Sequence, residues 1–218
     1  MDRLFSLDER LKMCASLVSE NARLADVGTD HAYLPVWLMK NNIISYAIAS
    51  DINEKPLESG KRTAEKYGAE NIDFRLGSGL EPISSNDKIT DAVIAGMGGE
   101  IIGEIILSSP LTKDKNLSLI LQPMTKSEEL ISLLYENGFE IEAQKCVVSK
   151  GKCYTVMRVR YSGNRITVDE VFPYIGKLDL TDETNRLFLG AHIRHLENKS
   201  IGDSNLKPLV KKLKKMIL

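Results

Sequence analysis

The stretch LADVGTDHAYLP, residues 24–35, constrains the fold of this chain more than any other segment does. A short apolar run ends at Asp26 and Gly28, and a polar turn leads from there into residues with helical spacing. This order of strand, glycine turn and helix is typical of the first unit of a nucleotide-binding α/β sheet. The turn nevertheless holds one glycine where dinucleotide-binding turns hold three, and Asp30 stands where a pyrophosphate would have to lie.

The two carboxylates of this turn limit the ligand that it can hold. Asp26 and Asp30 would repel a phosphate at short range and attract a cation. S-adenosylmethionine carries a sulfonium and an ammonium group and no phosphate, so the turn predicts a methyltransferase and argues against an NAD-dependent dehydrogenase. Asp30 has an alternative interpretation as the N-cap of the following helix.

Strands and helices alternate through the first 160 or so residues. We expect strands at 23–27, 46–50, 72–76, 91–95, 117–121, 139–147 and 153–159, and helices at 7–19, 33–41, 55–67, 99–107 and 127–137. Strands separated by helices predict right-handed crossovers and a mainly parallel, doubly wound sheet. The turn Ser149–Lys152 is too short for a crossover, so the last strand is antiparallel. The fold class predicted is α/β, a Rossmann-like class I methyltransferase with a seven-stranded sheet.

Further polar and glycine residues follow the other strands, at the edge of the sheet where ligands bind. An acid after the second strand is suited to a ribose diol, so Asp51 is a candidate ribose ligand, with a helix cap as its alternative. The glycine-rich turns after the third and fourth strands allow a ligand to approach the backbone closely. The candidates at these positions are Ile52, Ser78, Gly79, Leu80, Ala95, Gly96, Met97 and Gly98, with Gln122 after the fifth strand as a substrate contact. His31 either contacts the ligand or caps its helix, and Trp37 is expected in the core.

Residues 163–218 are predicted to form a separate helical extension behind residues 1–162. We expect a helix from an N-cap at Thr181 to about residue 198, and a second helix after a cap at Ser204, packed as a hairpin. This segment holds 10 Lys+Arg against 7 Asp+Glu, whereas residues 1–162 hold 19 against 23. A basic extension on an acidic body indicates a polyanionic partner, although a solvated lysine-rich helix face is the alternative. The candidate phosphate contacts are Lys207, Lys211, Lys212, Lys214 and Lys215.

Several classes of protein are not expected. Cys14, Cys146 and Cys153 have neither zinc-site spacing nor a disulfide pattern, and no metal is expected. No apolar stretch reaches the ~18 residues of a membrane span, and the first residues lack a signal peptide. A cytoplasmic protein is therefore expected, as a monomer or weak dimer.

The motifs LADVGTDHAYLP, ASDIN, AGMGGEII and LILQP together resemble the bacterial tRNA adenine-22 N1-methyltransferase family, from about Leu7 to Val159. In that family a class I domain binds S-adenosylmethionine, and a C-terminal helical coiled coil helps to grip tRNA. The resemblance implies a cofactor site at Asp26, Gly28, Asp30, His31 and Asp51, with Ser78, Gly79 and Leu80 near the adenine of the cofactor. Thr29, in the same turn after the first strand, is a further candidate for the cofactor site. Gly96, Met97 and Gly98 would lie between the cofactor and the target base. Ser78 and Met124 depart from the family pattern.

The reaction that follows from this resemblance is methyl transfer to N1 of an adenine in tRNA. The N1 lone pair is unprotonated at neutral pH, so the reaction needs alignment more than a general base. Asp26 or Asp30 would act electrostatically, and the target nucleotide must be unpaired or pulled from its stack. The alternatives are a methyltransferase acting on another RNA, a small molecule or a protein, and a non-catalytic RNA-binding protein of the same fold.

Overall fold

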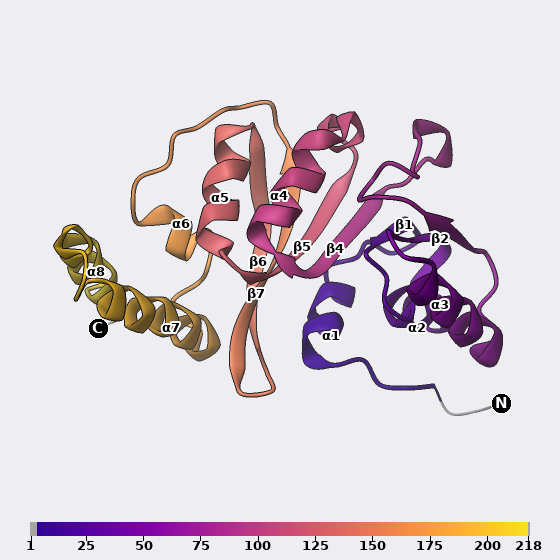
Figure 1. The fold of residues 1–218 in the computed structure, drawn as a ribbon, viewed down its shortest axis with the longest axis horizontal. Helices are drawn as coiled ribbons and strands as arrows, with labels where there is room; N and C mark the ends of the chain where they lie inside the picture. Colours follow the sequence, from indigo (N-terminus) through magenta and orange to yellow (C-terminus); the bar gives the residue numbers. More distant parts are fainter. Residues whose placement is uncertain (1–3, 218) are drawn as a thin grey trace.

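The computed structural model describes residues 4–217 and contains one seven-stranded sheet (Figure 1). Its strand order is β3-β2-β1-β4-β5-β7-β6. Strands β1 to β5 run parallel, and β7 is antiparallel to both of its neighbours, β5 and β6. The strands are β1 (Ala22–Val27), β2 (Ile44–Asp51), β3 (Ile72–Leu76), β4 (Asp91–Gly98), β5 (Ser118–Thr125), β6 (Phe139–Ser149) and β7 (Lys152–Tyr161). This topology confirms the predicted class I methyltransferase fold.

Helices cover both faces of the sheet because alternate residues of each central strand point to opposite sides. Leu24 of β1 packs with α1 (Glu9–Ala15) and α2 (Tyr33–Lys40), and α3 (Glu54–Tyr67) lies beside α2. Ala25, the next residue, packs with α4 (Gly99–Ser108) and α5 (Ser127–Glu136). Helix α1 is shorter than the 7–19 span that its spacing predicted. Trp37 packs against the α1–α2 core, as expected.

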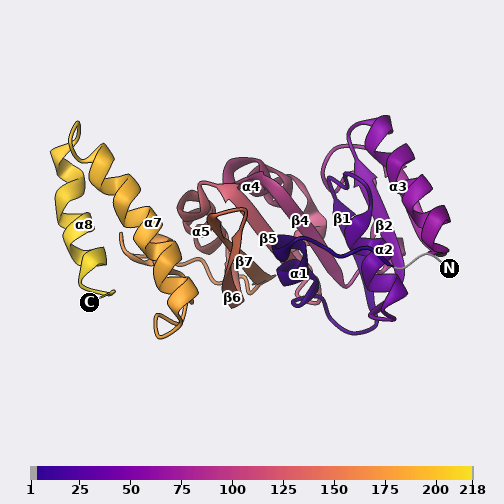
Figure 2. The ribbon, with the colours of Figure 1, turned by 90° about the horizontal axis from the view of Figure 1, so that it is seen from below.

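The C-terminal helices form a hairpin beyond β6 (Figure 2). A short helix α6 (Phe172–Ile175) precedes α7 (Glu183–Lys199) and α8 (Lys207–Lys214). Both predicted caps are wrong. Asp182 caps α7 by accepting from Asn185 N at 3.1 Å. Helix α8 begins after Leu206 without a side-chain cap, behind a 3₁₀ turn (Ser204–Leu206) that Asp203 caps. Asp is a better N-cap residue than Thr, and the Thr181 hydroxyl donates to Asp179 instead, at 2.7 Å.

Helix α7 is docked on the edge of the sheet. The apolar side chains of α7 and α8 share a buried cluster with Cys146 of β6. Asn185 Oδ1 accepts a hydrogen bond from Cys146 N at 3.2 Å, so the helix satisfies a backbone donor of the edge strand. His192 of α7 is mostly buried, with its Nε2 3.3 Å from Ser127 Oγ of α5. The C-terminal helices are therefore anchored to the rest of the chain through α7.

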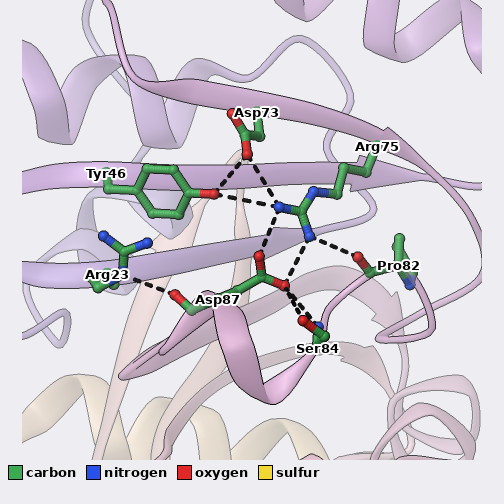
Figure 3. A network of polar contacts seen from close by, with 7 residues as sticks. All are labelled: Arg23, Tyr46, Asp73, Arg75, Pro82, Ser84 and Asp87. Atoms are coloured by element: carbon green, nitrogen blue, oxygen red, sulfur yellow. Dashed lines mark hydrogen bonds and ion pairs between the residues drawn. The ribbon is translucent and has the colours of Figure 1, made fainter.

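A polar network fixes the connection between β3 and β4 (Figure 3). Arg75 of β3 donates to both carboxylate oxygens of Asp87 at 2.8 Å and to the carbonyl of Pro82 at 2.9 Å. Asp73 accepts from Arg75 and from the hydroxyl of Tyr46 on β2. The negative charge and hydrogen bonds of these groups hold the guanidinium in place. The connection that begins at residue 77 is thereby held against β2 and β3.

No helix among residues 4–217 is both long and apolar enough to cross a membrane.

Candidate functional site

Two adjoining cavities open at the carboxyl ends of the parallel strands. The first, which we call the β1/β4 cavity, has a volume of about 580 Å³. The predicted site residues that line it are Asp26, Gly28, Thr29, Asp30, His31, Ala95 and Gly96. The second, the β2/β3 cavity, has a volume of about 430 Å³ and is lined by Gly28, Asp51, Ile52, Ser78, Gly79 and Met97. The two cavities therefore bring together most of the residues that the sequence analysis singled out.

Gly28 lies at the junction of the two cavities. Its φ of +75° is in the left-handed region, which favours glycine. A Cβ at this position would lie 2.1 Å from the terminal methyl of Met97. The amides of Gly28 and Thr29 both donate to the carbonyl of Ser50, at 2.8 and 2.9 Å, which ties the turn to the end of β2. A ligand that spans both cavities must cross Gly28 beside Met97.

Asp26 and Asp30 differ in their surroundings. Asp26 is buried, and burial raises the pKa of its carboxyl to about 6, with the charge of Asp51 adding to the shift and the Thr29 hydroxyl opposing it. Asp30 is exposed and lies 3.6 Å from His31 Nε2 through its Oδ1 atom. The helix-cap alternative is wrong for both Asp30 and His31, because α2 begins after Ala32 with no side-chain cap bond.

Asp51 combines a structural contact with a free oxygen. Its Oδ1 atom accepts from the amide of Asn53, the N-cap residue of α3, at 2.8 Å. No hydrogen bond within residues 4–217 uses Oδ2. One carboxylate oxygen therefore orders the start of α3, while the other is available to a ligand in the β2/β3 cavity.

Three predicted site residues lie away from both cavities. Leu80 is buried in the core beneath α4, because the chain turns inward after Gly79. Gly98 is the N-cap residue of α4. Gln122 is fully buried: its Oε1 accepts from the amide of Gly96 at 3.2 Å, and its Nε2 donates to the carbonyl of Pro123 at 2.9 Å. Gln122 therefore supports the Gly96 turn instead of lining the cavity.

The five predicted phosphate contacts in and directly after α8 do not share one surface. Four of them line a groove of about 600 Å³ between α7 and α8, namely Lys207, Lys211, Lys214 and Lys215. Lys214 also pairs with Glu197 in this groove. Lys212 points elsewhere and pairs with Glu170.

The sequence analysis missed several residues of the β1/β4 cavity, among them Arg10, Tyr33 and Lys150. Arg10 of α1 donates to Gln122 Oε1 at 3.2 Å and pairs with Asp8 at 2.9 Å. Lys150 reaches the same cavity from the turn between β6 and β7, and Tyr33 from the first turn of α2. None of these three residues comes directly after a parallel strand. The expectation that ligand-binding residues follow the strands therefore did not include them. The spacing around Tyr33 predicts the start of a helix and nothing about the cavity.

The donor set of the two cavities fits S-adenosylmethionine. Asp26 offers a negative charge to its cationic end, and the free oxygen of Asp51 suits a ribose hydroxyl. The hydroxyl of Ser50 is buried beside these carboxylates without a partner among residues 4–217, and such groups normally find one. Within the same residues no three His, Cys, Asp or Glu side chains are grouped to hold a metal ion, and the three cysteines are free.

Comparisons with known proteins give the same assignment. Residues 7–157 match the family described as a methyltransferase domain. The chain is 33% identical to the tRNA (adenine(22)-N(1))-methyltransferase of Bacillus subtilis over 88% of its length and 82% of that protein. Its fold matches a candidate tRNA (m1A22) methyltransferase of Streptococcus pneumoniae, solved in complex with S-adenosyl-L-methionine. That match has a TM-score of 0.87 and 30% identity, and it covers 98% of this chain and 100% of that one.

A solved structure of the Bacillus subtilis M1A22 tRNA methyltransferase matches with a TM-score of 0.86 and 26% identity, over 99% of this chain and 100% of that one. These likenesses include the C-terminal helices as well as the sheet. Sequence, fold and the pair of cavities agree with the resemblance found in the motifs. The chain belongs to the tRNA (adenine(22)-N(1))-methyltransferase family of class I S-adenosylmethionine-dependent methyltransferases.

Proposed function

We propose that this protein transfers a methyl group from S-adenosylmethionine to N1 of adenine 22 in tRNA. The observation that carries the proposal is the pair of cavities that meet at Gly28, with Asp26 in one and Asp51 in the other. They occur in a chain that aligns over nearly its whole length with a relative solved with S-adenosyl-L-methionine. We also infer a cytoplasmic location, because tRNA is the substrate.

When bound, the cofactor supplies an electrophilic methyl group on a sulfonium. The ionised carboxylate of Asp26 attracts the positive charge of the cofactor, and Asp51 holds the ribose by its free oxygen. Gly28 lets the ligand approach the backbone closely at the junction of the cavities. These contacts fix the position of the methyl group relative to the opening of the β1/β4 cavity.

The target adenine enters beside Gly96. This residue has a φ of +80°, and no atom lies within 4 Å of a Cβ built on it, so the space next to the backbone is open. Gln122 holds the Gly96 amide, and Arg10 holds Gln122, which keeps this wall in place. Alignment of N1 with the methyl carbon supplies most of the rate enhancement, roughly 7–11 kcal/mol in well-ordered systems. The positive charge that develops on the adenine is stabilised by the carboxylates of Asp26 and Asp30.

The lysine groove between α7 and α8 supports binding of the tRNA backbone. Lys207, Lys211 and Lys215 have no anionic partner among residues 4–217, whereas Lys214 pairs with Glu197. Contacts of this kind release counterions, so tRNA affinity should fall as salt rises.

The test is a methylation assay with purified protein, S-adenosylmethionine and unmodified tRNA, followed by mass spectrometry of the digested RNA. We expect 1-methyladenosine in the fragment that contains position 22, and none in a tRNA that carries guanosine there. Formation of no methylated nucleoside by a protein that binds S-adenosylmethionine would refute the proposal.

A further inference from the structure

A column of aromatic rings leads from α3 to the β1/β4 cavity. Tyr67 meets Phe5 with 5.0 Å between ring centroids, and Phe5 meets Tyr33 at 4.9 Å. His31 stacks on Tyr33 at 5.1 Å with an angle of 22° between the ring planes. Phe5 and Tyr33 thus have an aromatic neighbour on each side, and His31 is the last ring of the column.

The end of the column is open. The side chain of His31 is 41% exposed, and Tyr33 is 42% exposed. Both residues line the β1/β4 cavity. Large exposed aromatic surface next to a binding cavity favours stacking with another planar ring. Among residues 4–217, no second ring stacks on His31 besides Tyr33. The other face of the imidazole is therefore free to stack on a ring of a ligand.

The cofactor's own adenine does not fill this place. The ribose-binding candidate Asp51 and its neighbour Ile52 line the β2/β3 cavity, and neither lines the β1/β4 cavity. Met97 lies against Gly28 between the two cavities. The adenosine half of the cofactor therefore lies on the far side of Gly28 from the column. Its methionine half, which reaches the β1/β4 cavity, has no ring to stack.

The local backbone presents the two rings together. Ala32 has a φ of +52°, and this left-handed residue between His31 and Tyr33 turns the chain so that their side chains stack. A non-glycine residue in this region costs of the order of 1 kcal/mol or more, which the surrounding structure must offset. Asp30 lies beside the imidazole, with 3.6 Å between Oδ1 and His31 Nε2. The stack on Tyr33 therefore sets the orientation of the terminal ring.

We propose that the open face of His31 is the platform on which the target adenine stacks when it enters the β1/β4 cavity. This inference rests on the proposed function. Enzymes that modify a base act on an unpaired nucleotide or extrude it from its stack, and an extruded adenine loses stacking energy. Stacking of the adenine on His31 offsets part of that lost energy inside the enzyme, since every base has a π-face that can stack on an aromatic side chain. Lys150, at the rim of the same cavity, is placed to attract the phosphates that flank the extruded nucleotide.

The test compares two substitutions at one position. His31→Phe keeps a flat ring and removes the imidazole nitrogens, whereas His31→Leu removes the ring. We expect His31→Phe to retain the KM for tRNA within about threefold and His31→Leu to raise it roughly tenfold or more. Titration calorimetry should give both variants the wild-type affinity for S-adenosylmethionine. Tyr67→Leu is the matched control, because it removes the far ring of the column, which does not line the cavity, and it should leave the KM for tRNA unchanged.

A second measurement reports on stacking itself. A tRNA that carries 2-aminopurine at position 22 should lose fluorescence on binding to the wild-type protein and to His31→Phe, and less so on binding to His31→Leu. The platform is wrong if His31→Leu has the wild-type KM for tRNA. It is also wrong if both variants lose affinity for S-adenosylmethionine to the same extent, because His31 would then be a cofactor ligand through its nitrogens. If the wild-type protein methylates no tRNA, the proposed function fails and the platform fails with it. A methylating wild type with unaffected variants refutes the platform alone.

Discussion

Replacement of Gly28 by alanine tests whether the junction of the two cavities needs glycine for the backbone or for the ligand. The φ of +75° costs an alanine about 1–2 kcal/mol of strain. Alanine also restricts the unfolded chain, which offsets about 0.4–1 kcal/mol of that cost. The net loss of stability is therefore about 1 kcal/mol, or roughly 2–4 °C in the melting temperature of a chain of this length.

The effect on ligand binding should be much larger than this. The new Cβ would lie 2.1 Å from the terminal methyl of Met97, which can rotate away because it is the end of a flexible side chain. The added methyl group itself would remain in the path of the cofactor between the cavities. We expect the affinity for S-adenosylmethionine, measured by titration calorimetry, to fall at least about tenfold, equivalent to about 1.4 kcal/mol.

Two controls separate the causes. Gly151→Ala, in the turn between β6 and β7, introduces alanine at the same φ of +75° with no atom within 4 Å of its Cβ. It should lose a similar amount of stability and keep its cofactor affinity. The double variant with Met97→Ala removes the side-chain clash and should remain weak in cofactor binding. Wild-type affinity in Gly28→Ala, or full recovery in the double variant, would refute the reasoning that the ligand itself crosses Gly28.

Three further perturbations have defined outcomes. Burial raises the pKa of Asp26 to about 6, so cofactor affinity should weaken toward tenfold per pH unit below that value and Asp26→Asn should flatten the profile in calorimetry. The same shift favours the free folded protein below about pH 4, and this contribution to stability is lost as the pH rises through about 6. Asp87→Ala removes both hydrogen bonds to the Arg75 guanidinium and should lower the free energy of unfolding by about 2–3 kcal/mol. Thermal unfolding should show a drop of roughly 5–10 °C in the melting temperature, and an unchanged melting temperature would contradict this reasoning. Arg10→Met should lower kcat for methylation roughly tenfold with little change in melting temperature, since Gln122 loses a hydrogen-bond donor. Arg10→Lys should restore part of the lost kcat. An unaltered kcat in Arg10→Met would show that Arg10 does not support catalysis through Gln122.

The sheet and much of the site could be predicted because both follow from local patterns. Each parallel strand is a short apolar run, and the residue after it lies at the carboxyl ends of the strands, where ligands bind. This position does not depend on the conformation of the loop that follows. Asp26 and Asp51 were found in this way. Arg10 could not be, because it reaches Gln122 from a helix 112 residues earlier in the chain. Lys150 likewise enters the cavity from the antiparallel hairpin, to which the rule for parallel strands does not apply.

The misplaced residues show where a local pattern stops being informative. Leu80 directly follows Gly79 in the same turn, yet Gly79 lines the β2/β3 cavity and Leu80 is buried in the core. On α8, the lysine spacing identifies a polar face but not which part of it meets α7. Lys212 therefore pairs with Glu170 while its neighbour Lys211 lines the groove. Such choices depend on tertiary packing, which one segment of sequence does not encode.

The docking of α7 on β6 has a consequence for how the C-terminal segment can be studied. If residues 163–218 were removed, the amide of Cys146 would lose its acceptor Asn185, and the outermost strand would offer unpaired donors and apolar side chains to other molecules. Exposed strand edges of this kind recruit strands from neighbouring chains. A truncated enzyme would therefore be prone to self-association, and its inactivity would say nothing about tRNA. Charge reversal of Lys211 or Lys215, on a chain of full length, is the informative experiment.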